Sequence, residues 1–129
     1  MAMQLTEDQE SIRETVERVC LEFEDDYWLE HDESGDFPEE FYRAMADGGW
    51  LGIAMPEEFG GAGLGVTEAS IMMHTVAKTR GAMSAASAIH MNIFGPHAIT
   101  VFGNQEQKER WIPDLILSLI HISEPTRPY

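Results

Sequence analysis

Residues 5–29, LTEDQESIRETVERVCLEFEDDYWL, decide how the chain begins to fold. Apolar side chains or a thiol recur there at intervals of three and four residues, at Ile12, Val16, Val19, Cys20, Phe23 and Tyr27. This spacing places them on one face of an α-helix, and the acidic side chains between them fall mostly on the opposite, solvated face. Thr6, followed three residues later by Gln9, is typical of a capping box at a helix start. The stretch predicts one amphipathic helix from Leu5 to about Leu29.

The rest of the chain continues the helical pattern, and no segment alternates with the period of two that marks a strand. Pro38 and the two acids after it predict the start of a second helix, which Gly48 and Gly49 end. Thr67 is expected to cap a third helix that ends just before Gly81. These features predict an all-α bundle of about five helices.

The last two helices are predicted around a proline and a capping pair. A fourth helical stretch runs from about Ser84 to Phe102, and Gly95-Pro96 should kink or split it because proline removes a backbone donor. Asn104 with Gln107 predicts the cap of a fifth helix.

The charge of the chain is strongly asymmetric. The formal net charge is −15, from 8 basic and 23 acidic residues among 129. Residues 1–47 hold 16 acids and 3 bases, a net of −13, which leaves only −2 for everything after Asp47. Such a field repels nucleic acid and anionic membranes, so neither is an expected partner.

Two further features bear on the compartment. The chain has one cysteine, so no internal disulfide suggests an oxidising environment, and the expected location is cytoplasmic. Residues 81–105 carry no Asp, Glu, Lys or Arg and are long enough to span a bilayer. His90, Asn92, Pro96 and His97 within them favour a buried helix in a soluble protein instead.

No catalytic constellation is visible in the residue pattern. The segment Gly60-Gly-Ala-Gly-Leu-Gly65 matches neither a P-loop nor the dinucleotide fingerprint, and Glu57 and Glu58 beside it would repel a phosphate. A tight structural loop is therefore predicted there. The five histidines show no metal-chelating spacing, and no serine sits in a nucleophile elbow. For His90 alone, a core histidine with satisfied nitrogens is the common explanation.

Four segments, taken in order, resemble one family. They are Leu5-Thr-Glu-Asp-Gln9, Phe37-Pro-Glu-Glu-Phe41, Met55-Pro-Glu-Glu-Phe-Gly-Gly-Ala-Gly-Leu64 and Phe102-Gly-Asn-Gln-Glu-Gln-Lys-Glu-Arg-Trp-Ile-Pro113. Together they resemble the N-terminal helical domain of the acyl-CoA dehydrogenases, over about residues 5–115. The domain is assigned to residues 1–116.

The resemblance implies a parent flavoenzyme built from this domain, a β-domain and a second helical bundle, assembled as a homotetramer. It implies FAD held mostly outside this chain, an acyl-CoA substrate, and an electron-transfer flavoprotein as the electron acceptor. In such enzymes a carboxylate from a later part of the chain removes the α-proton of the acyl-CoA while the β-hydrogen leaves as hydride to the flavin. The present chain lacks that base, so it is expected to be inactive alone.

The resemblance also names candidate binding residues. In the family, the helix corresponding to residues 84–94 runs beside the acyl chain, and by position Ala86, Ser87, His90 and Phe94 would line it. These positions recur on one helical face. A histidine is unusual in an apolar wall, so either it faces another polar group or the substrate is not a plain fatty acyl chain. Core packing of these residues is an equally weighted alternative.

The chain departs from the family pattern after Ile116. Residues 117–129 include Ser123-Glu124-Pro125, but the Gly-Ser-Asp that follows in the family is absent. This segment resembles the translation of a sequencing adapter and is predicted to be a non-native tail.

Two alternative functions stay open, one that uses a flavin and one without catalysis. A same-fold acyl-CoA oxidase or flavin monooxygenase would be distinguished by rapid reaction with oxygen. A non-catalytic helical interaction module would be a folded monomer that does not bind hydrophobic dyes. A domain cut from its parent would expose apolar surface and would bind such dyes.

Overall fold

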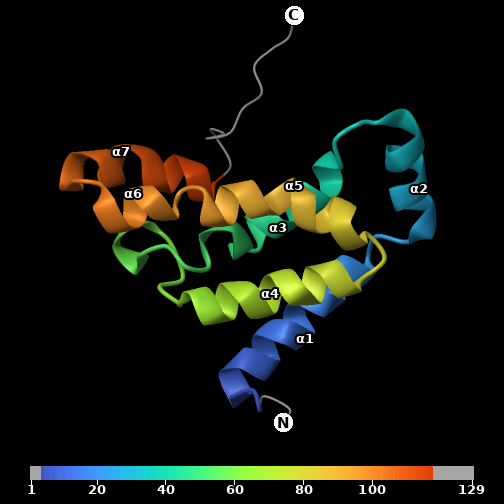
Figure 1. The fold of residues 1–129 in the computed structure, drawn as a ribbon, viewed down its shortest axis with the longest axis horizontal. Coiled ribbons are helices and arrows are strands. Elements are labelled where there is room, and N and C mark those ends of the chain that lie inside the picture. The colour runs from blue at the N-terminus through green and yellow to red at the C-terminus, as the bar shows by residue number, and fades with distance from the viewer. Residues whose placement is uncertain (1–3, 118–129) are drawn as a thin grey trace, which may run out of the picture.

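The computed structural model describes residues 4–117, and within that range the chain forms seven α-helices, two 3₁₀ helices and no strand. Helices α1 and α4 lie together at one side, α5 crosses the middle above α4, and α6 and α7 pair at one end (Figure 1). The elements are α1 (Glu7–Leu21), α2 (Asp25–Ser34), α3 (Glu39–Asp47), η1 (Trp50–Gly52), η2 (Glu57–Phe59), α4 (Val66–Lys78), α5 (Ala82–Phe94), α6 (His97–Phe102) and α7 (Gln105–Ile116).

The predicted all-α fold is confirmed, and the helix number differs because two predicted helices are each divided. The fourth stretch is split at Gly95-Pro96 into α5 and α6, as the proline indicated. The first is also divided, between Leu21 and Asp25, where no glycine or proline occurs. The break turns Phe23 into an aromatic cluster, with its ring centroid 5.5 Å from that of Phe41. Tertiary packing has overridden local helix propensity here.

Capping pairs define the helix starts. The box of Thr6 and Gln9 begins α1, and that of Asn104 and Gln107 begins α7, as predicted. The expectation that Thr67 caps the third helix is wrong, because α4 begins at Val66 and its cap position is Gly65. The carboxylate of Glu68 accepts the Gly65 N–H at 3.1 Å, which replaces a side-chain cap from that position.

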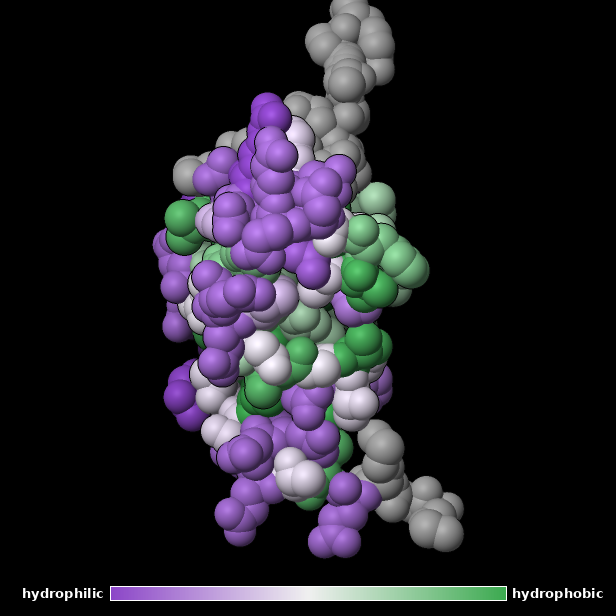
Figure 2. Space-filling view, turned by 90° about the vertical axis from the view of Figure 1, so that its left-hand side faces the viewer, coloured by the Kyte–Doolittle hydropathy of each residue, from purple (hydrophilic) through white to green (hydrophobic). Residues whose placement is uncertain are grey.

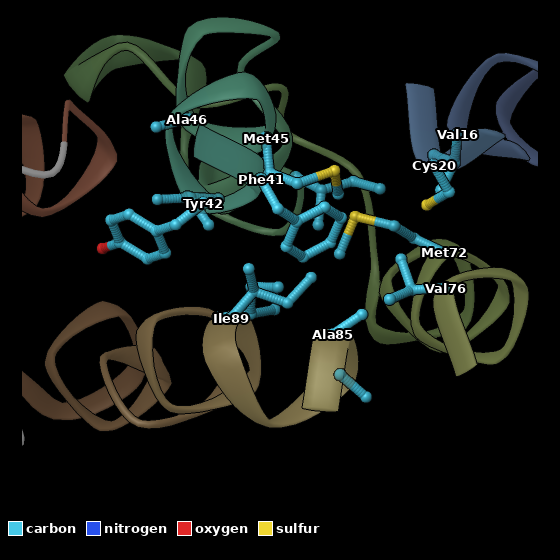
Figure 3. Packing of buried hydrophobic residues seen from close by; sticks show 14 of the residues in the cluster. Val16, Cys20, Phe41, Tyr42, Met45, Ala46, Met72, Val76, Ala85 and Ile89 are labelled. Carbon is cyan, nitrogen blue, oxygen red and sulfur yellow. The ribbon is translucent and has the colours of Figure 1, made fainter. Parts of the chain in front are cut away.

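The main core lies where α1, α3, α4 and α5 converge. Figure 3 shows Phe41 and Met45 of α3 pointing toward Met72 of α4 and Ile89 of α5. Cys20 joins them from α1, and its burial raises the pKa of its thiol. A second, smaller cluster of Met55, Phe59, Ile112 and Ile116 joins α7 to the loop after α3. The contacts of the main core fix α5 against both α3 and α4.

The glycine-rich segment is a closed structural loop, as predicted. The five consecutive amides of residues 60–64 donate to carbonyl oxygens of residues 52–57, at 2.8–3.0 Å. Gly60 and Gly63 have positive φ angles of 97° and 68°, which other residues rarely adopt. A Cβ on Gly61 would lie 2.2 Å from the carbonyl oxygen of Met55. Since these amides are already paired inside the loop, the loop offers them to no phosphate.

Two predictions concern the C-terminal segment and a possible membrane span. The predicted tail, residues 117–129, lies outside the described residues except for Leu117. Between residues 4 and 117, the structure contains no helix with the length and apolar character needed to cross a bilayer.

Substitution of Gly61 tests the loop. Gly61→Ala should lower the free energy of unfolding by about 1–3 kcal/mol, because the new methyl group overlaps a backbone carbonyl that the loop holds in place. Thermal unfolding followed by circular dichroism measures this. Gly65→Ser is the matched control, since its backbone is extended and serine favours a cap position. Equal stability of Gly61→Ala and the wild type would contradict the loop geometry.

The cap of α4 predicts a pH dependence. Hydrogen bonds from its own backbone N–H and from the Gln9 side chain lower the pKa of Glu68 from its ordinary value near 4.5, with a further contribution from Gly65 N–H. A lowered pKa in the folded state stabilises the fold above the unfolded value, and the effect is lost as pH falls through the folded value. Glu68→Gln should therefore melt at a lower temperature than the wild type at pH 7. In acid, where Glu68 of the wild type is protonated, the two melting temperatures should converge. Glu58→Gln, at an exposed position in η2, is the control, and a pH-independent Glu68→Gln difference would refute the prediction.

Candidate functional site

Helix α5 carries all four residues predicted to bind substrate. One face of the helix is buried through Ala85, Ile89 and Ile93, which pack in the main core. None of its 13 residues is Asp, Glu, Lys or Arg. The helix therefore meets the core on one side and presents an uncharged surface on the other.

The structure separates the predicted residues into two groups. Ala86 is 7% exposed and belongs to the main core, so little of its surface is available to a ligand. Ser87 and His90 are exposed, and Phe94 is 40% exposed. The core-packing alternative thus describes Ala86, whereas the other three side chains share the outer face of α5.

Exposed apolar side chains flank Ser87 and His90 on that outer face. Met83 is 73% exposed and Met91 is 43% exposed. With Phe94, they occupy positions 83, 91 and 94, which lie on the same side of the helix as 87 and 90. We refer to Met83, Ser87, His90, Met91 and Phe94 as the outer face of α5. Large exposed apolar groups close together are typical of a surface that another molecule or domain covers.

Exposed apolar side chains also occur on α6 and α7. Phe102, at the end of α6, is 85% exposed, and Trp111 of α7 is 38% exposed. The two residues line a shallow hollow of about 270 Å³. Figure 2 shows green, hydrophobic groups exposed among hydrophilic ones on this end of the molecule.

A buried hydrogen bond orients α5 on the core. The amide nitrogen of Asn92 donates to the hydroxyl of Tyr42, in α3, at 2.8 Å. Both residues are buried, and the amide oxygen of Asn92 has no hydrogen-bond partner. A buried polar pair is satisfied only in one relative placement of its two helices. This bond therefore fixes the rotation of α5 and thus which residues point outward.

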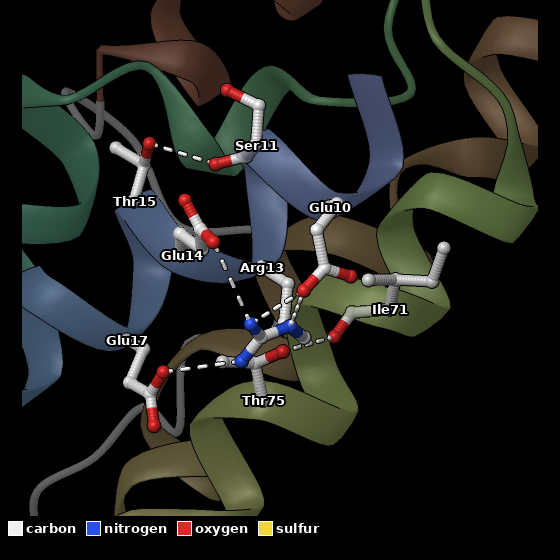
Figure 4. Close-up of polar contacts among 8 residues, drawn as sticks. All are labelled: Glu10, Ser11, Arg13, Glu14, Thr15, Glu17, Ile71 and Thr75. Atoms are coloured by element: carbon white, nitrogen blue, oxygen red, sulfur yellow. Dashed lines mark hydrogen bonds and ion pairs between the residues drawn. The ribbon is translucent and has the colours of Figure 1, made fainter. Parts of the chain in front are cut away.

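A groove between α1 and α4 has a volume of about 650 Å³ and does not include the outer face of α5. Arg13 lies in it and pairs with Glu10, Glu14 and Glu17, the last at 3.2 Å (Figure 4). No local sequence pattern predicts this groove, because its lining combines residues near or in α1 with residues of α4 that lie far away in the chain. Its lining residues are Leu5, Arg13, Glu17, Val66, Thr67, Ser70, Ile71, His74, Thr75 and Lys78.

Among the described residues, no group of side chains is placed to hold a metal ion, and the amides of the glycine loop are not free to bind a phosphate. Residues 4–117 contain no group of three or more His, Cys, Asp or Glu side chains placed to hold a metal ion. The paired amides of residues 60–64 do not fit a flavin diphosphate. The outer face of α5 can contribute an uncharged wall to a site.

Comparisons with known proteins identify what the chain is similar to. The family model described as acyl-CoA dehydrogenase, N-terminal domain, matches residues 6–117. A mitochondrial isovaleryl-CoA dehydrogenase of Bos taurus is 32% identical over 127 residues, which cover 94% of this chain and 30% of that protein. An acryloyl-CoA reductase (NADH) of Anaerotignum propionicum is 33% identical over 115 residues, covering 89% and 29%.

A solved structure shares the fold. One chain of the electron transferring flavoprotein of Acidaminococcus fermentans, studied for flavin-based electron bifurcation, superposes with a TM-score of 0.79 at 25% identity. The match covers 91% of this chain and 30% of that one. The chain thus spans about 30% of the length of the relatives it matches.

The Asn92–Tyr42 bond predicts a non-additive pair of substitutions. Tyr42→Phe should cost about 1–3 kcal/mol of stability, because it leaves the buried Asn92 amide without its acceptor. The double variant Tyr42→Phe with Asn92→Leu should recover part of that loss, since no buried amide remains. Urea unfolding of the two single variants and the double variant measures the coupling. Additive losses would show that the bond does not hold α5 in place.

Proposed function

Because the chain belongs to the acyl-CoA dehydrogenase family through its N-terminal domain, we propose that its parent protein is an FAD-dependent acyl-CoA dehydrogenase. The parent would carry out α,β-dehydrogenation of an acyl-CoA thioester. The observation that carries the proposal is a family match over residues 6–117 in which an uncharged helix leaves an apolar face uncovered. The flavin and the base would be supplied by parts of the parent outside this chain.

The role we propose for this domain is one wall of the acyl-binding cavity. The acyl chain would lie along Ser87, His90 and Phe94, with Ala86 supporting the helix from the core side. An apolar, water-poor wall favours the reaction because electrostatic interactions within the site strengthen when water is excluded. The missing charges on α5 and α6 support this role, since a charge there would have to be desolvated by the acyl chain.

The wider setting of the parent is part of the same proposal. It would work as a homotetramer and pass electrons to an electron-transfer flavoprotein. We place it in the cytoplasm, although the bovine relative is described as mitochondrial.

A carboxylate placed on the acyl wall tests the function. In the full-length parent, Phe94→Asp should lower kcat/KM for its acyl-CoA by about tenfold or more, because the chain would have to desolvate a charge. Because Phe94 is 40% exposed and ends α5, the melting temperature of the variant is measured alongside to confirm that the domain stays folded. Steady-state reduction of an electron-transfer flavoprotein measures the activity.

Leu29→Asp is the matched control. Leu29 is also exposed, at 56%, but lies on α2. Its substitution should leave kcat/KM unchanged. An equal loss in both variants would argue against a wall role for α5. Fast reaction of the reduced parent with oxygen, without transfer to the flavoprotein, would favour an oxidase or monooxygenase instead.

A further inference from the structure

The outer face of α5 has a polar centre that a plain fatty acyl chain does not explain. Ser87 and His90 are exposed between Met83, Met91 and Phe94. They are three residues apart on a helix, so their Cβ atoms lie roughly 5–6 Å apart. One small polar group could contact both side chains at once.

A hydrogen bond to the backbone determines what His90 offers to that group. Its Nδ1 lies 3.2 Å from the carbonyl oxygen of Ser87. A carbonyl oxygen only accepts, so this contact is a hydrogen bond when Nδ1 carries the proton. In the neutral ring, Nε2 then holds a lone pair and acts as an acceptor.

The hydroxyl of Ser87 complements this acceptor. A serine hydroxyl can donate one hydrogen bond and can also accept. The pair therefore offers one acceptor, Nε2 of His90, and one donor, Oγ of Ser87, on the same helix face. A hydroxyl group fits this combination, since it donates to Nε2 and accepts from the serine. Covering both atoms with a saturated hydrocarbon chain would instead leave two polar groups desolvated and unpaired.

The surroundings favour a neutral polar group over an anion. Neither α5 nor α6 contains Lys or Arg, so no permanent cation on these helices could pair with a ligand carboxylate. His90 could do so only in its protonated form. The domain itself carries a net charge of −15, which disfavours a further anion.

Building on the proposed function, we infer that the substrate is an acyl-CoA whose chain carries a hydroxyl group, bound between Ser87 and His90. These two residues are then specificity-determining. The flanking methionines and Phe94 contact the methylene groups on either side.

The test compares acyl chains that differ only in the added polar group. The full-length parent enzyme is assayed with hexanoyl-CoA, with its 4-, 5- and 6-hydroxy derivatives, and with adipyl-CoA. At least one hydroxy derivative should show a kcat/KM about tenfold above that of hexanoyl-CoA, in line with one satisfied hydrogen-bonding site. His90→Leu should reduce this ratio by about tenfold, Ser87→Ala should reduce it less, and His90→Gln should restore part of it.

His97→Leu, on α6, is the control and should keep the wild-type ratio. A preference for hexanoyl-CoA over every hydroxy derivative, or a ratio that His90→Leu leaves unchanged, would overturn the inference while leaving the proposed function standing. Adipyl-CoA as the best substrate would overturn it in favour of a carboxylate. Failure to oxidise any of these thioesters, or any simple acyl-CoA, would overturn the proposed function and this inference together.

Discussion

Helix α5 has to be buried on one side and uncovered on the other, and the rest of the domain is arranged around this requirement. Ala85, Ile89 and Ile93 fill the space between α3 and α4, as Figure 3 shows for the first two. The bond from Asn92 to Tyr42 sets the rotation of the helix. With that rotation fixed, Ser87, His90 and Phe94 can only point outward. The packing of the core therefore selects the side chains that a ligand or another domain would meet.

Charge is distributed in agreement with this arrangement. Acidic residues are concentrated on α1, α2 and α3, where they cover solvated helix faces or favour helix N-termini. Helices α5 and α6 carry no permanent charge. A surface that another part of a protein covers should have a small free energy of desolvation, and uncharged side chains meet that condition. The large negative charge of the chain thus comes from its solvent-exposed helix faces and does not indicate which ligand it binds.

Several elements could be predicted because their signals are local. The capping boxes at Thr6 and Asn104, and the split at Pro96, depend on residues within one helical turn. The break between α1 and α2 was not predicted, although the acids at 24–26 are a signal typical of a helix start. Its cause lies elsewhere in the sequence, in the contact of Phe23 with Phe41. The start of α4 was placed wrongly although its capping pair, Gly65 and Glu68, is local, because glycine has no side chain to mark the cap position; Glu68 also accepts from Gln9 of α1.

The sequence by itself determined the helical class, the glycine loop, the acidic character of the first third and the family. Each of these follows from spacing, composition or motifs that are written along the chain. Only the tertiary structure decided that Ala86 is a core residue while Ser87 and His90 are exposed, and that α1 and α4 enclose a groove. Periodicity shows which residues share a helix face, but which face is buried depends on what the neighbouring helices place against it. For α5, whose two faces are both uncharged, that choice was made by α3 and α4.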